Sequence, residues 1–179
     1  MYALNKKKEL NDLYEKIYLI SLIICILFTV FISYFGAILF EIWLNDLIEY
    51  NVSLIKSILL YVLISSYWNI NGNVLMSINK HLILSKFQLI FSILAIYLCW
   101  LGTKTNYLEF AIYGLIIGEA VPMVIVSTYL ISKNEVNINL NSILKNIILY
   151  FLVLISITTE PVYSLLILIY CFIKLLKKD

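Results

Sequence analysis

The sequence from Ser65 to His81 reads SSYWNINGNVLMSINKH and places four asparagines and three serines among almost entirely apolar neighbours. What such amides do depends on whether the surrounding solvent is water or lipid. Of the 179 residues, 63% are hydrophobic and 13% are charged. A soluble domain is about half apolar and about a quarter charged. The composition therefore excludes a soluble globule and predicts an all-α, polytopic membrane helix bundle.

Charge and cysteine usage narrow the class of protein further. The net charge is +2, which gives no reason to expect nucleic acid as a partner. Every basic residue is a lysine, so no arginine clamp can form on phosphate or carboxylate. Cys25, Cys99 and Cys171 lie inside apolar runs without metal-ligand spacing. We find no nucleophile–base pair, and expect neither an enzyme nor a cofactor.

The apolar runs predict about six transmembrane helices. A span needs about 20 apolar residues. The last apolar run, Ile143 to Leu176, would reach about 50 Å as one helix. It contains TTEPVY, where Pro161 disfavours helix in the preceding residue, and is therefore split there. The predicted spans are Tyr18–Phe40, Val52–Ile78, Leu82–Leu101, Leu108–Ser132, Leu140–Thr158 and Pro161–Leu176.

Lysine placement favours six helices over five. With the N-terminus inside, six spans put 11 of the 13 lysines in inside segments and 2, Lys56 and Lys104, outside. Five spans would give 8 against 5, because the last three lysines would move outside. Cytoplasmic segments of membrane proteins carry the excess of lysine. The expected architecture is one transmembrane domain over residues 1–179, multi-pass, with both termini cytoplasmic.

The amides of the second span form a stripe. The residues Ser66, Asn69, Asn73, Ser77 and Lys80 are spaced by three or four and share one helical face. An unsatisfied amide in hydrocarbon costs several kcal/mol, so the stripe is expected to face other helices or a wet cavity. Interhelical hydrogen bonding is one interpretation. The length of the stripe favours the other, in which these residues line a substrate path.

The fourth span carries an acid near its middle. Glu119 is a functional candidate because intramembrane acids commonly serve ion or substrate paths. Its alternative is a neutral acid hydrogen-bonded to a neighbouring helix. Gly114 and Gly118 form a G-x-x-x-G pair that permits close helix packing. Pro122 cannot donate to the Gly118 carbonyl and should kink the helix, as a hinge or within a static bundle.

The order of these features resembles the C-terminal part of bacterial polysaccharide (O-antigen type) flippases of the multidrug/oligosaccharidyl-lipid/polysaccharide exporter superfamily. The charged lead-in KKKELNDLYEKIYLIS starts at Lys6, and AILFEIWLND, from Ala37, is similar to the family's Ile-Trp-Leu-Gly ending with Asn45 for glycine. YWNINGNVLMSINKHLILSK, from Tyr67, resembles the helix that ends in a glycine-lysine turn, with Asn79 for glycine. IYGLIIGEAVPMVIVSTYLI, from Ile112, resembles the small-residue helix that follows.

The resemblance implies a function and a location. Family members move undecaprenyl-linked oligosaccharide between leaflets of the bacterial cytoplasmic (inner) membrane, in the synthesis of lipopolysaccharide O-antigen and related polysaccharides. Two helical lobes alternate access to a polar central cavity. The amide stripe would line that cavity, and Lys80 and Lys86 would lie near its cytoplasmic mouth. Family members are about twice as long, so this chain would lack the N-terminal lobe and need that lobe or a second copy to enclose a path.

Two other classes remain open. One is a fragment of a polytopic glycan polymerase or of an acyl- or glycosyltransferase, although such enzymes usually carry a large outer loop and the loops here are short. A non-transporting accessory or structural membrane subunit is the other alternative. Membrane lipid is a partner under every interpretation.

The six-helix prediction can be tested by cysteine labelling in intact cells. A cysteine at Lys104 should react with an impermeant thiol reagent from outside, whereas one at Lys178 should react only after the membrane is opened. Reaction of the Lys178 position from outside would contradict six helices. The unsubstituted chain measures background reaction at Cys25, Cys99 and Cys171.

Overall fold

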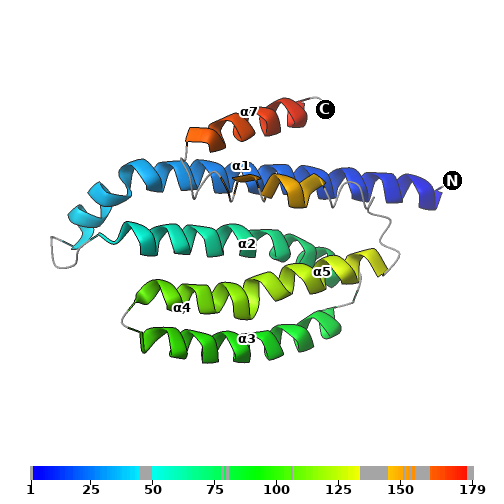
Figure 1. The fold of residues 1–179 in the computed structure, drawn as a ribbon. Helices are drawn as coiled ribbons and strands as arrows, with labels where there is room; N and C mark the ends of the chain where they lie inside the picture. The colour runs from blue at the N-terminus through cyan, green and yellow to red at the C-terminus, as the bar shows by residue number, and fades with distance from the viewer. Residues whose placement is uncertain are drawn as a thin grey trace.

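A computed structural model describes residues 2–44, 50–77, 79, 81–105, 107–133, 145–150, 152, 153, 155 and 162–176. Within these ranges the chain is almost entirely helical and forms no strand, as the composition predicts. The helices are α1 (Tyr2–Leu44), α2 (Val52–Ser77), α3 (His81–Thr103), α4 (Leu108–Leu115), the π-helical turn η1 (Ile116–Ala120), α5 (Val121–Lys133) and α7 (Val162–Leu176) (Figure 1).

Four of the predicted membrane spans are present as long apolar helices. They cover Asn11–Trp43, Val52–Ser77, Leu82–Thr103 and Leu108–Lys133, the last being α4, η1 and α5 in succession. Each has 22 residues or more, enough for about 30 Å of hydrocarbon. Large apolar side chains cover their outer surfaces, among them Ile24 at 60% and Ile96 at 68% exposure. Such surfaces suit lipid, and the chain is a membrane-embedded helical protein.

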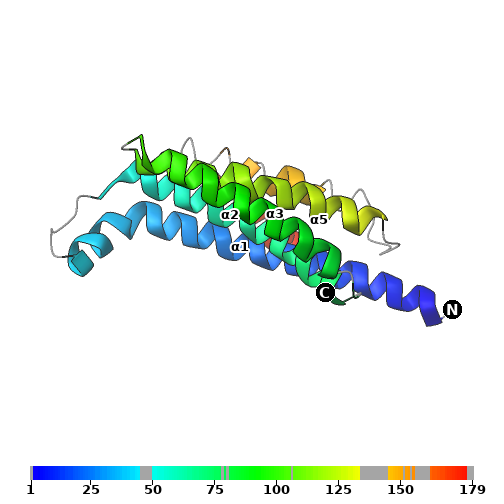
Figure 2. The same ribbon diagram turned by 90° about the horizontal axis from the view of Figure 1, so that it is seen from below.

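Successive long helices run in alternating directions. α1 and α3 run one way in Figure 1, and α2 and the α4–α5 helix run the other. Figure 2 shows the same helices lying close to parallel when the bundle is turned. α3 packs on α4 and η1, α2 packs on α4 and α5, and α1 joins this group along α2. Residues at equal distances from the starts of α2 and α4 therefore lie at similar depths.

The first helix is longer than its predicted apolar span. The chain is helical from Tyr2, although the predicted span begins at Tyr18. The preceding segment, which includes KKKELNDLYEK, contains neither proline nor glycine, so no residue stops the helix between water and lipid. Polarity thus marked the edge of the apolar run but did not mark a helix boundary.

The predicted fifth and sixth spans are described only in part. Residues 145–150, 152, 153 and 155 are helical, and the rest of Leu140–Thr158 lies outside the described residues. So do Glu160 and Pro161, where the sequence predicts a turn. The sixth span corresponds to α7, whose 15 residues reach about 22 Å, less than the hydrocarbon thickness of about 30 Å. α7 packs on α1 and ends toward the end of the bundle where α1 begins (Figure 1).

Asn79 shapes the connection between α2 and α3. Its φ of 59° lies in the left-handed region, and its N–H donates to the Met76 carbonyl at 3.1 Å. Asparagine is the residue that most often replaces glycine in this conformation after a helix. Asn79 thus adopts a conformation that glycine favours.

Three glycines let α3 and the α4–η1 helix approach to backbone contact. A Cβ on Gly114 would lie 2.7 Å from the Cys99 nitrogen, and one on Gly102 would lie 2.5 Å from the Phe110 carbonyl carbon. A Cβ on Gly118 would overlap the Ala95 backbone. The G-x-x-x-G pair therefore lies on a helix–helix contact where backbone meets backbone.

Two glycine-to-alanine substitutions should differ in their effect on stability. Gly118→Ala should destabilise the bundle by about 1–3 kcal/mol, because α3 must move to admit a methyl group. Gly72→Ala is the matched control, since its Cβ would meet Leu84 Cδ2 at 3.4 Å and Trp68 beyond that. It should be neutral or stabilising by up to about 1 kcal/mol. Denaturant unfolding in mixed micelles measures both, and equal effects would contradict the backbone contact.

Candidate functional site

The most completely bonded polar group in the described part of the protein is the side chain of Asn71. Its Oδ1 accepts hydrogen bonds from the hydroxyls of Tyr14 at 2.6 Å and Tyr18 at 2.5 Å. Its Nδ2 donates to Ser127 Oγ at 3.1 Å and to Thr128 Oγ1 at 3.4 Å. A carboxamide has two acceptor lone pairs and two N–H donors, so this cluster uses its full capacity.

This cluster, called here the Asn71 hub, joins three helices. Tyr14 and Tyr18 belong to α1, Asn71 to α2, and the two hydroxyl residues to α5. Asn71 is fully buried, and Tyr14 and Tyr18 are 2% and 1% exposed. Because hydrocarbon offers no partner to polar groups, a satisfied buried network fixes the register of its helices. The hub can therefore hold α1 against the α2–α5 pair, which is a structural role.

The sequence-based prediction did not include Asn71, although the spacing of polar residues on two spans indicated a buried polar contact. Asn71 lies two residues from Asn69 and from Asn73, so it points to the other side of the helix. The buried face of α2 instead runs Leu63, Tyr67, Asn71 and Leu75 at steps of four. On α1, Tyr14 and Tyr18 are also four apart. Matching polar residues at helical spacing on two spans would have identified the hub.

The predicted stripe lies elsewhere on α2. Asn69, Asn73 and Ser77 are exposed in this chain, and Lys80 lies outside the described residues. Ser77 Oγ donates to the Val74 carbonyl of its own helix at 2.7 Å. Ser66 is separated from this exposed group, since it is half-buried and donates to the Leu63 carbonyl at 2.7 Å. Ser66 also faces other helical segments, since Cys25 Sγ and the Tyr150 hydroxyl each lie 3.5 Å from its Oγ. That the rest of the stripe faces other helices or a wet cavity stays a prediction.

Among the exposed amides, Asn69 lies deepest. It stands eight residues before the end of α2 at Ser77, or about 12 Å along the helix. The 26 residues of α2 reach about 39 Å, which exceeds the hydrocarbon by about 9 Å. With α2 centred, Asn69 lies several ångströms inside the hydrocarbon, and Asn73 lies near its edge. Asn73 can reach headgroups and water, whereas Asn69 needs a polar neighbour.

Glu119 lies in the π-helical turn η1, halfway along its span. It is half-buried and eleven residues past Leu108. It interacts with the Tyr61 hydroxyl of α2, nine residues past Val52, and Tyr61 also lies beside Ser65. Glu119 thus lies against the second span, where the residue it contacts is Tyr61. Ser66 and Asn69 are not its partners in any described contact.

The expected disturbance at Pro122 takes the form of a π turn. The Val121 N–H donates to the Ile116 carbonyl, five residues back, directly before Pro122. Proline lacks an N–H, so the regular ladder must be interrupted near this point, and one wider turn accommodates the interruption. The turn brings together Gly118, which contacts α3, and Glu119, which approaches α2. Single π turns in helices often accompany functional residues.

The described residues contain no group of three or more histidine, cysteine, aspartate or glutamate side chains arranged to hold a metal ion. Comparison with models of protein families, with curated proteins and with solved structures finds no match to this chain. The site must therefore be interpreted from its own chemistry.

Removing the Asn71 carboxamide should destabilise the bundle. Asn71→Ala removes the acceptor that the buried Tyr14 and Tyr18 hydroxyls share and leaves Tyr18 with the Tyr67 carbonyl at 3.2 Å, at a cost of about 1–3 kcal/mol. Asn73→Ala, on the exposed side of the same helix, is the matched control and should change the free energy of unfolding by less than about 0.5 kcal/mol. Denaturant unfolding in mixed micelles measures both. In a double-mutant cycle, additive effects of Asn71→Ala and Tyr18→Phe would contradict the hub.

Proposed function

We propose that this chain is a helical lobe of a bacterial inner-membrane carrier that moves lipid-linked oligosaccharide between leaflets by alternating access. The sequence resemblance supplies the substrate class. Support from the fold is the exposure of Asn69 on a membrane-spanning helix. A polar group at that depth needs a neighbour that is not lipid. A sugar path between two lobes supplies such a neighbour.

The buried Asn71 hub and the exposed amides of α2 would have different roles. The Asn71 hub is internally satisfied and would hold the lobe rigid during movement. Asn69 and Asn73 are exposed, and their amides can donate to and accept from sugar hydroxyls. Ser77 and Lys80 would extend the path toward the cytoplasmic face. Ser66, whose hydroxyl bonds to its own helix, would contribute less than its place in the stripe suggests.

Glu119 would supply energetic coupling. A carboxyl group at mid-membrane depth can take up a proton on one side and release it on the other. Its interaction with Tyr61 spans two helices, so a change of its charge would alter the contact between α2 and the η1 turn. Gly118 and Pro122, in the same region, would allow α5 to move when the charge of Glu119 changes. If the bundle is rigid, Glu119 serves only as a hydrogen-bonding residue.

The lobe would need a second lobe to enclose a path. The exposed amides lie on one face of α2, and the described chain does not close over them. A separate N-terminal lobe or a second copy of this chain would complete the cavity. An accessory structural subunit is the competing function, and the satisfied Asn71 hub favours it, because such a network also suits a static bundle. A fragment of a glycan polymerase or transferase is a further alternative.

Substitutions on the two faces of α2 separate transport from structure. In cells that depend on the chain for surface polysaccharide, Asn69→Leu should lower export about tenfold, the effect of losing about 1.4 kcal/mol of hydrogen bonding. Glu119→Gln should lower export similarly by removing the proton-carrying group. Both variants should accumulate at normal levels, and Met76→Leu, also exposed on α2, is the matched control.

Two results would contradict the proposal. Full export by the Asn69→Leu and Glu119→Gln variants would show that neither residue takes part in transport. Reduced protein level with unchanged export per molecule would identify them as packing residues and favour the accessory subunit. Asn71→Ala should give that second pattern, so it serves as the reference for a structural defect.

A further inference from the structure

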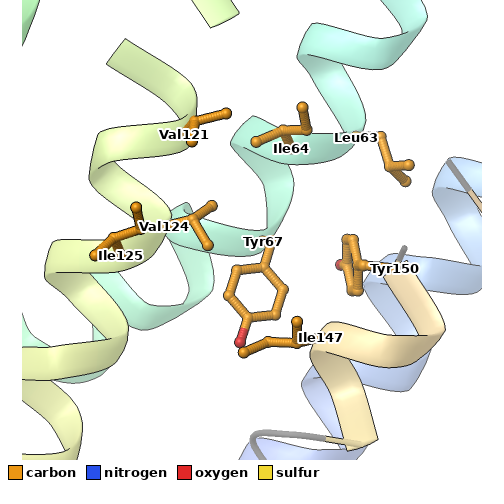
Figure 3. Close-up of a pocket in the computed structure, with 8 residues that line it drawn as sticks. All are labelled: Leu63, Ile64, Tyr67, Val121, Val124, Ile125, Ile147 and Tyr150. Atoms are coloured by element: carbon orange, nitrogen blue, oxygen red, sulfur yellow. The ribbon is translucent and has the colours of Figure 1, made fainter. Parts of the chain in front are cut away.

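A pocket of about 320 Å³ lies between three helical segments. Leu63, Ile64 and Tyr67 line it from α2, and Val121, Val124 and Ile125 line it from α5. Ile147 and Tyr150 of the segment 145–150 form the third wall (Figure 3). The volume falls in the range of pockets that bind small molecules, roughly 300–1,000 Å³.

The walls of this pocket expose almost only carbon. Six of the eight lining side chains are aliphatic, and the other two are tyrosines. The Tyr150 hydroxyl donates to Ser21 Oγ at 3.4 Å and lies 3.5 Å from Ser66 Oγ, so it is engaged with α1 and α2. The rings of Tyr67 and Tyr150 meet edge to face at 5.1 Å. Water needs polar partners to occupy a cavity, and these walls expose almost none.

The pocket opens at mid-membrane depth. Val121 and Ile125 lie 13 and 17 residues into the span Leu108–Lys133, and Leu63 lies 11 residues into the span Val52–Ser77. Val121 and Ile125 are 41% and 64% exposed, so the mouth lies on the outer surface of the bundle. The solvent at that surface and depth is lipid hydrocarbon. The occupant must therefore enter from the bilayer and present an aliphatic chain.

We propose that this pocket retains one acyl chain of a membrane phospholipid between the α2–α5 pair and the segment 145–150. The chain enters past Val121 and Ile125 and contacts the rings of Tyr67 and Tyr150. The Asn71 hub joins α1 to α2 and α5 through polar bonds, and the retained chain fills the apolar gap beside the same junction. The inference requires membrane embedding and is independent of the proposed transport function.

Electron paramagnetic resonance of a chain-labelled phospholipid tests this site. The full-length protein is reconstituted in vesicles of phosphatidylcholine that carry a nitroxide on the acyl chain. The number of motionally restricted chains per protein is then counted. Ile147→Phe and Val124→Phe fill the pocket from opposite walls and should each remove a single restricted chain. Ile96→Phe, 68% exposed on α3, enlarges a lipid-facing side chain outside the pocket and should remove none.

A second measurement uses the unaltered protein, so the test does not depend on folding of the variants. A phospholipid with a photoreactive group in its acyl chain should label Tyr150, although that residue is only 6% exposed, because it lines the pocket. Ile131 and Met123 are fully buried away from the pocket and should stay unlabelled. Equal numbers of restricted chains in all variants, or no label on Tyr150, would overturn the proposal. Loss of self-association in Ile147→Phe with an unchanged lipid count would assign the pocket to a second copy.

Discussion

The structure depends on one constraint: a polar group in hydrocarbon must find its partner within the protein. The backbone meets this constraint by forming long helices, which explains the absence of strands in the described ranges. The side chain of Asn71 meets it by placing two hydroxyl donors and two hydroxyl acceptors around one carboxamide. The same constraint makes an exposed amide at Asn69 informative, because no described side chain satisfies it.

The constraint also explains why small residues lie where they do. Between helices in lipid there is little hydrophobic driving force, so packing requires close approach. Gly102, Gly114 and Gly118 permit that approach along the contact of α3 with α4 and η1. The π turn before Pro122 lies in this contact. On one side of this turn, Gly118 packs tightly against α3. On the other side, Glu119 interacts with Tyr61 of α2. The turn therefore lies between a tightly packed contact and a polar contact.

The sequence predicted the helical membrane character and four of the spans, because apolar length carries that information directly. It misjudged the start of α1, because polarity changes at a membrane surface while helix propensity does not. It also left Asn71 out of the candidate residues on α2. Periodicity identified two faces of α2 but could not say which face met α1, since Asn71 and Asn69 are the same residue type. Only partners on other helices, such as Tyr14 and Ser127, distinguish a buried amide from an exposed one.

Burial and chemistry together separate two faces of α2. The buried face carries Leu63, Tyr67 and Asn71 at steps of four. Its Asn71 end is closed by hydrogen bonds to α1 and α5, and its Leu63 and Tyr67 end lines an apolar pocket suited to an acyl chain. The opposite face carries Asn69 and Asn73 and is open. A static bundle has use for the buried face and none for Asn69, because an open amide inside hydrocarbon only lowers stability. The open face is therefore the one that a function must explain.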